Sequence, residues 1–151
     1  MKHLLFFLII SISNNFIFAQ NYSIKLKSSI IEAINKHNVY NVKKSGHYLL
    51  TFSSIPNQDE KNEMESIGIN FLEYIPNNTY VVYSSKNLSY DDFLGYNLYS
   101  ITKIIPSFKI DPKISKNSFP KWVIFDNKLH VKILAYKHIS LNLVKESLLS
   151  I

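Results

Sequence analysis

Apolar and polar segments alternate through residues 46–106 in an order that predicts four strands separated by turns and short helices. Residues 47–52, 69–75 and 79–84 are rich in aliphatic and aromatic side chains, as expected for strands. A Pro-Asn-Asn triplet alone separates the second segment from the third, which predicts an antiparallel pair with a tight turn. A fourth strand is expected over residues 97–105, before a proline.

The residues that follow the first strand predict a helix. Asn57 and Glu60 have capping-box spacing. In a capping box, the side chain of each residue accepts a hydrogen bond from the backbone N–H of the other. The helix is expected to continue to Ile67, with Met64 and Ile67 facing the sheet, and Gly68 to end it.

A second helix is expected over residues 87–95, with Ser89 as its cap and Phe93 and Leu94 as its apolar face. The resulting order, β-α-β-β-α-β, is the split βαβ or ferredoxin-like arrangement of an α+β domain.

Both faces of this expected sheet are apolar, although helices in such a unit cover only one of them. Strand alternation places one apolar set on the same side, namely Tyr48, Leu50, Phe52, Tyr80 and Val82. An uncovered apolar face indicates a docking surface. We therefore expect these five side chains to contact a partner, unless the C-terminal hairpin folds back over them.

The flanking segments are expected to form separate units. Residues 1–20 have the basic start and apolar stretch of a signal peptide, too short to favour a membrane anchor. In residues 21–45, Ser29 and Glu32 have capping-box spacing, and Ile30, Ile31 and Ile34 form a stripe, which predicts a helix to about residue 37.

The C-terminal part is expected to be a linker, residues 107–120, followed by an incomplete second unit, residues 121–151. Residues 122–125 and 129–136 predict a hairpin about Asp126-Asn127. Ser140 is the expected cap of a final amphipathic helix. The fold class is thus an α+β, ferredoxin-like unit followed by an incomplete hairpin-plus-helix unit.

Composition removes several classes of function. The 151 residues include no cysteine, which excludes disulfides, thiolate metal sites and cysteine nucleophiles. The formal charge is +6, but the basic residues are scattered lysines with no arginine, a pattern that does not favour nucleic-acid binding.

No catalytic arrangement is expected either. The sequence has no G-x-S-x-G elbow, and the five histidines lack the spacing of a zinc site. Ser140, two residues after His138, is interpreted as a helix cap rather than a nucleophile. We expect no catalytic residues, no metal and no cofactor.

The order of these motifs resembles the N-terminal region of secreted subtilisin-like serine peptidases of the Bacteroidetes type. The likeness lies in the strand GHYLLTF, the helix that ends at Gly68, and the segment IGINFLEYIPNNTYVVY. In that family the region is a ferredoxin-like prodomain that docks its sheet on the catalytic domain, assists its folding and inhibits it.

The resemblance implies a subtilisin-like catalytic domain as partner, in cis or in trans, and a secreted, periplasmic or cell-surface location. The Asp, His and Ser motifs of the peptidase are absent from this sequence, so no catalysis is expected from the chain itself. Two alternatives remain: a free-standing exported binding module without a peptidase, and a degenerate fragment without its own function.

Overall fold

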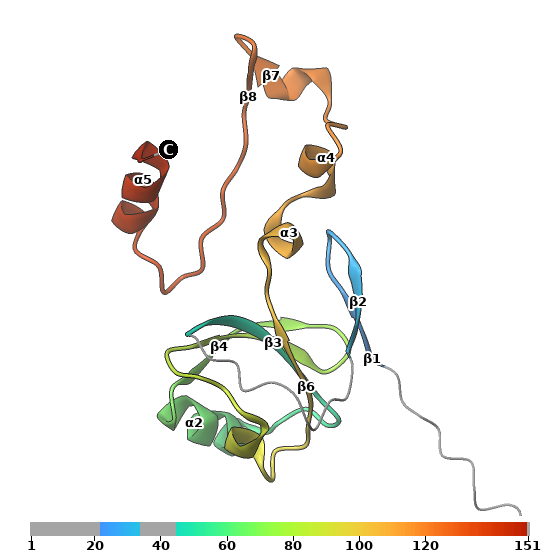
Figure 1. Ribbon diagram of the computed structural model, residues 1–151, viewed down its shortest axis with the longest axis vertical. Helices are drawn as coiled ribbons and strands as arrows, with labels where there is room; N and C mark the ends of the chain where they lie inside the picture. Colours follow the sequence, from blue (N-terminus) through green and yellow to red (C-terminus); the bar gives the residue numbers. More distant parts are fainter. Residues whose placement is uncertain (1–21, 34–44, 151) are drawn as a thin grey trace, which may run out of the picture.

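The chain is a mixed α+β protein in which a four-stranded antiparallel sheet carries a helix on one side and a hairpin on the other (Figure 1). The computed structural model describes residues 22–33 and 45–150. The expected signal peptide, residues 1–20, lies outside the described residues, as do residues 34–37 of the expected N-terminal helix.

The central sheet confirms the four predicted strands. Its strands are β3 (Gly46–Phe52), β4 (Ile69–Ile75), β5 (Thr79–Ser84) and β6 (Leu98–Lys103). The order across the sheet is β4-β5-β3-β6, and every neighbouring pair is antiparallel. β3 and β4 therefore run in the same direction, with β5 between them.

The tight turn between β4 and β5 depends on two asparagines. Asn77 and Asn78 have φ angles of 71° and 55°, in the left-handed region that asparagine tolerates better than most residues. Three residues, Pro76, Asn77 and Asn78, join the two strands, and positive φ at both asparagines lets the chain reverse within this short loop. The side-chain amide of Asn77 also donates a hydrogen bond of 2.6 Å to the Ser23 backbone carbonyl. This bond connects the turn to the N-terminal segment.

The helix α2 (Gln58–Ser66) begins with the predicted capping box. The Glu60 amide donates to Asn57 Oδ1 at 2.9 Å, and the Asn57 amide donates to Glu60 Oε2 at 2.7 Å. Met64 is fully buried, as predicted, but the prediction for Ile67 is wrong, because 40% of it is exposed. Ile67 is the residue after the last helical turn, so the helix no longer directs its side chain inward.

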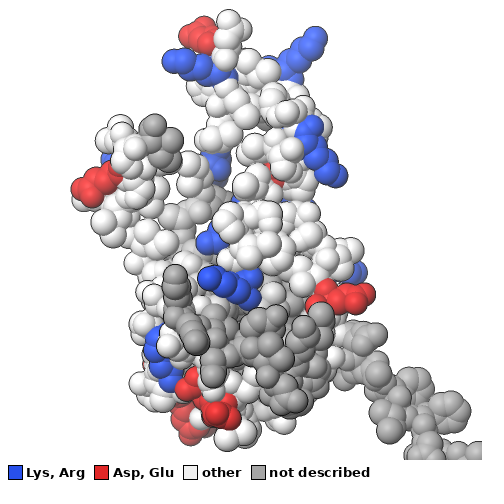
Figure 2. Space-filling view, in the orientation of Figure 1, with Lys and Arg blue, Asp and Glu red and all other residues white. Residues whose placement is uncertain are grey.

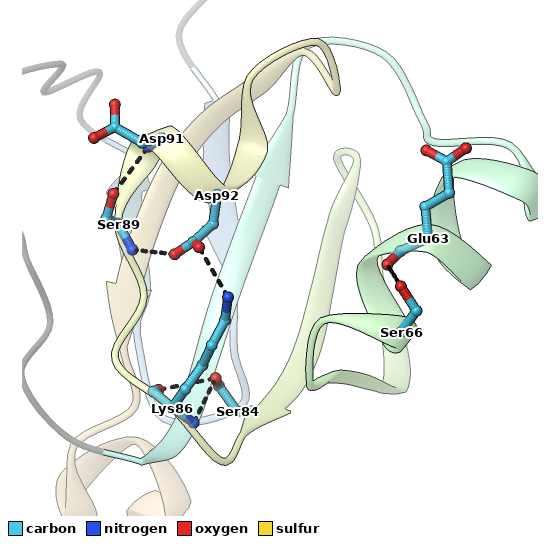
Figure 3. Close-up of polar contacts among 7 residues, drawn as sticks. All are labelled: Glu63, Ser66, Ser84, Lys86, Ser89, Asp91 and Asp92. Carbon is cyan, nitrogen blue, oxygen red and sulfur yellow. Dashed lines mark hydrogen bonds and ion pairs between the residues drawn. The ribbon is translucent and has the colours of Figure 1, made fainter.

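The second predicted helix is only a single 3₁₀ turn, η1 (Tyr90–Phe93). Ser89 caps it by accepting from the Asp91 amide, and Asp92 accepts both from the Ser89 amide and from Lys86 Nζ (Figure 3). Phe93 is buried as expected, whereas Leu94, which follows the 3₁₀ turn with φ −58° and ψ 123°, is 76% exposed.

An antiparallel hairpin replaces the helix expected near residue 30. β1 (Tyr22–Lys25) pairs with β2 (Ile30–Ala33), so the helix prediction is wrong for residues 30–33. Alternation explains the outcome, since Tyr22, Ile24 and Ala33 are buried while Lys25 and Glu32 face solvent.

Residues 105–150, named here the C-terminal arm, extend from β6 on the side of the sheet opposite α2 (Figure 1). The arm contains α3 (Pro106–Lys109), α4 (Pro112–Ser115) and η2 (Lys121–Val123), followed by β7 (Ile124–Phe125), β8 (Lys128–Leu129) and α5 (Leu141–Leu149). The predicted hairpin about Asp126-Asn127 is present but short, and Ser140 caps α5 as predicted.

Candidate docking surfaces

The five predicted docking residues lie in the buried core and do not form an exposed face. Their exposed fractions are 0% for four of them and 8% for Tyr80. The buried core cluster on this side of the sheet contains Tyr48, Leu50, Phe52, Met64, Ile69, Tyr80, Val82, Leu88, Phe93 and Ile101. The expectation of an open apolar face at these positions is therefore corrected.

Strand register explains this burial. β3 and β5 pair Tyr48 with Val82 and Leu50 with Tyr80, so the predicted set does share one face of the sheet. α2 places Met64 against that same face. The sequence pattern identified which side chains lie together but not which side of the sheet the helix covers.

The opposite face is covered as well, by the N-terminal hairpin. Leu49 and Val81 form a second buried cluster with Tyr22, Ile24 and Ala33 of β1 and β2. Beside this cluster the face is polar, since Thr51 Oγ1 and Thr79 Oγ1 are hydrogen-bonded at 3.0 Å in a fully buried position. Neither face of the sheet is left as an open apolar surface of the kind that the sequence suggested.

Aromatic rings attach the C-terminal arm to the edge of this second face. The His47 ring stacks on Tyr136 with centroids 4.4 Å apart, and His138 lies 5.3 Å from His47 and 4.8 Å from Tyr83. Lys109 Nζ lies 5.7 Å from the Tyr136 ring centroid. No local pattern in the sequence predicted this contact, because residues 47 and 136 are distant in the chain.

The environment of His47 favours its neutral form. Burial, followed by the charges of Lys109 and His138, lowers the pKa of His47 from 6.5 to about 4. Its Nε2 atom is buried without a hydrogen-bond partner among the described residues. The imidazole is therefore an uncharged contact between the sheet and the arm at neutral pH.

Exposed apolar side chains are concentrated in the arm. Trp122 is 82% exposed, Leu134 81% and Leu149 87%, and no residue of α5 is buried. Between residues 122 and 149 the exposed large hydrophobic residues are Trp122, Ile124, Phe125, Leu129, Val131, Ile133, Leu134, Leu141, Leu143, Leu148 and Leu149. This concentration makes the arm the candidate docking surface of the described chain.

Residues 22–33 and 45–150 hold no group of three or more His, Cys, Asp or Glu side chains placed to bind a metal ion. Ser140 caps α5 through the Asn142 amide, as expected. Among the helices described, none has the length and apolar character needed to cross a membrane.

The chain belongs to the family described as "Domain of unknown function (DUF8729)", whose model matches residues 14–106. Among the described residues, the match covers the N-terminal hairpin and the central sheet, and it ends where the arm begins. No curated protein and no solved structure matches the chain.

Proposed function

We propose that the chain is a non-catalytic, exported module that binds another protein, of the kind that forms the prodomain of secreted subtilisin-like peptidases. The exposed apolar arm carries this proposal, because many large apolar side chains left exposed in one segment indicate a binding surface. Residues 1–20 supply the expected export signal, and removing them leaves residues 21–151, called here the mature chain.

Two further observations support the peptidase partner. β3 and β4 are parallel strands joined through α2, with β5 inserted between them, which favours the ferredoxin-like split βαβ arrangement of subtilase prodomains. The motif Tyr74-Ile75-Pro76-Asn77-Asn78, which belongs to the resemblance, covers the end of β4 and the β4–β5 turn. In this proposal the arm, rather than the sheet, contacts the catalytic domain.

An inhibition assay tests the proposal. The mature chain is added to a purified subtilisin-like peptidase of the Bacteroidetes type, and hydrolysis of a chromogenic peptide is followed. We expect inhibition at micromolar concentration that weakens when Leu141 and Leu148 are both changed to Asp, because these changes place charges on the exposed face of α5. Full peptidase activity at every concentration of the chain would contradict an inhibitory role.

A free-standing exported binding module remains the second candidate, because the same exposed arm would serve it. The two functions differ in one measurable property. A prodomain lowers peptidase activity and increases the yield of refolded peptidase, whereas a free-standing module does neither.

A further inference from the structure

Opposite charges are segregated between residues 45–104 and the C-terminal arm. Residues 45–104 hold seven carboxylates and three lysines, a net charge of −4, whereas residues 105–150 hold eight lysines and three carboxylates, a net charge of +5. Figure 2 shows a cluster of acidic side chains at the end where α2 lies and lysines along the arm. The eight lysines of the arm, all exposed, are Lys109, Lys113, Lys116, Lys121, Lys128, Lys132, Lys137 and Lys145.

The carboxylates of α2 have no basic partner within the described chain. The ion pairs in residues 22–33 and 45–150 are Lys27–Asp111 and Lys86–Asp92, and neither involves α2. The four acidic residues of the helix are Asp59, Glu60, Glu63 and Glu65. Within residues 22–33 and 45–150, the acidic surface that would complement the arm therefore has no ion pair to a lysine.

Apolar side chains accompany the charges on the α2 side too. Ile55 and Ile67 flank the helix and are 51% and 40% exposed. Tyr74, 47% exposed, packs against Tyr80, whose ring also lies 4.7 Å from Lys61 Nζ of α2. The α2 surface thus combines carboxylates with exposed apolar groups, as the arm combines lysines with exposed apolar groups.

We propose that the arm of one copy binds the α2 surface of a second copy, and that the exchange is reciprocal, giving a closed dimer. The charge signs fit, and each surface offers the apolar groups that the other would cover. The eleven exposed apolar side chains of the arm offer on the order of 800 Å² of apolar area. That is about the area that each partner contributes to a stable interface.

A second copy is needed because the arm does not cover the α2 surface of its own chain. In Figure 1 the arm lies on the side of the sheet away from α2, so its exposed residues do not cover the helix of the same chain. Two copies related by a twofold axis place each arm beside the other copy's α2, and both contacts are then made at once. The proposal does not depend on a peptidase partner.

The single tryptophan provides a direct test. Trp122 belongs to the arm and is 82% exposed, and the chain contains no other tryptophan. We expect the emission of the mature chain to shift to the blue as concentration rises, in parallel with a doubling of mass in sedimentation velocity. High salt should reverse both changes, because it screens the charges between the two surfaces. A monomer with solvent-exposed tryptophan emission at every concentration would overturn the proposal.

A charge-exchange cycle tests which surfaces meet. Reversal of the arm, K128E with K132E, and reversal of the helix, E63K with E65K, should each weaken the dimer by about tenfold or more. The four changes together should restore the dimer, which misfolding cannot explain. The matched control is K25E with K103E, two exposed lysines outside both surfaces, and it should leave the dimer unchanged.

Three other outcomes also test the proposed dimer. A dimer that is indifferent to both reversals would place the contact elsewhere and overturn the proposal. A blue shift seen only after a subtilisin-like peptidase is added would likewise overturn it, while supporting the peptidase-binding function. A dimer without any peptidase inhibition would support this inference and contradict the proposed function.

Discussion

His47 illustrates how one residue acquires its properties from the fold. Its place in a strand follows from the apolar alternation of residues 47–52, but the groups around it do not. Tyr83 comes from β5, while Lys109, Tyr136 and His138 come from the arm. These neighbours, together with burial, keep the imidazole neutral.

The stability of the chain should therefore fall in mild acid. Because the folded pKa of His47 is about 4 and the unfolded value is 6.5, the unfolded chain binds more protons between these values. Unfolding becomes easier as pH falls from 6.5 toward 4, by about 1–2 kcal/mol after allowance for the partial solvent exposure of the ring. Urea unfolding at several pH values measures this loss.

The control for the pH prediction is His47→Phe, which keeps a ring but removes the titrating group. Its unfolding free energy should lose less between pH 6.5 and 4 than that of the parent chain. An equal loss in both proteins would show that groups other than His47 cause the acid sensitivity.

Met64 and Ile67 form a matched pair for the core. Both were expected to face the sheet, but Met64 is fully buried and Ile67 is 40% exposed. Met64→Ala should lower the unfolding free energy by about 2–4 kcal/mol, because it leaves a cavity among Tyr48, Phe52 and their neighbours. Ile67→Ala should lower it by less than about 1 kcal/mol. Equal losses in urea unfolding would contradict the observed burial.

At the scale of elements, one capping signal led to three different structures. Asn57 with Glu60 begins a helix of nine residues, and Ser89 with Asp92 caps a single 3₁₀ turn. Ser29 with Glu32 has the same spacing but lies in a β-hairpin. Capping spacing indicates where a helix can begin, whereas the following residues and their burial decide whether it continues.

The Asn57 cap should contribute measurably to α2. Asn57→Ala removes the acceptor for the Glu60 amide and should reduce the unfolding free energy by about 1 kcal/mol. Asn57→Asp keeps an acceptor oxygen and should retain most of the stability, and helix content from circular dichroism should follow the same order. If the alanine variant were as stable as the aspartate variant, the capping bond would contribute nothing.

The whole molecule divides into a buried sheet region and an exposed arm. The sheet has a hydrophobic cluster on each face, one under α2 and one under the N-terminal hairpin. The arm has short elements, and no residue of α3, α4 or α5 is buried. Since stability derives mainly from buried apolar area, the two regions should differ in their resistance to local unfolding.

Trypsin should reveal this difference under dilute conditions in which the chain is monomeric. We expect the first cleavages after arm lysines such as Lys121 and Lys132, which are exposed and lie outside long helices. Lys61 and Lys86, which are half-buried and belong to the sheet region, should be cut later. Mass spectrometry of early fragments identifies the sites, and early cleavage after Lys61 with an intact arm would contradict the prediction.

Local pattern by itself determined the four central strands, the β4–β5 turn and the start of α2, because alternation, Asn-Asn turns and capping pairs act within a few residues. It also grouped Tyr48, Leu50, Phe52, Tyr80 and Val82 on one face, since strand geometry alternates with a period of two. Only the tertiary structure decided that α2 covers this face and the hairpin the other, and that the arm stays exposed. Which face of the sheet is covered depends on the distant segments that pack against it. The alternating pattern of a strand is the same whichever of its two faces is covered.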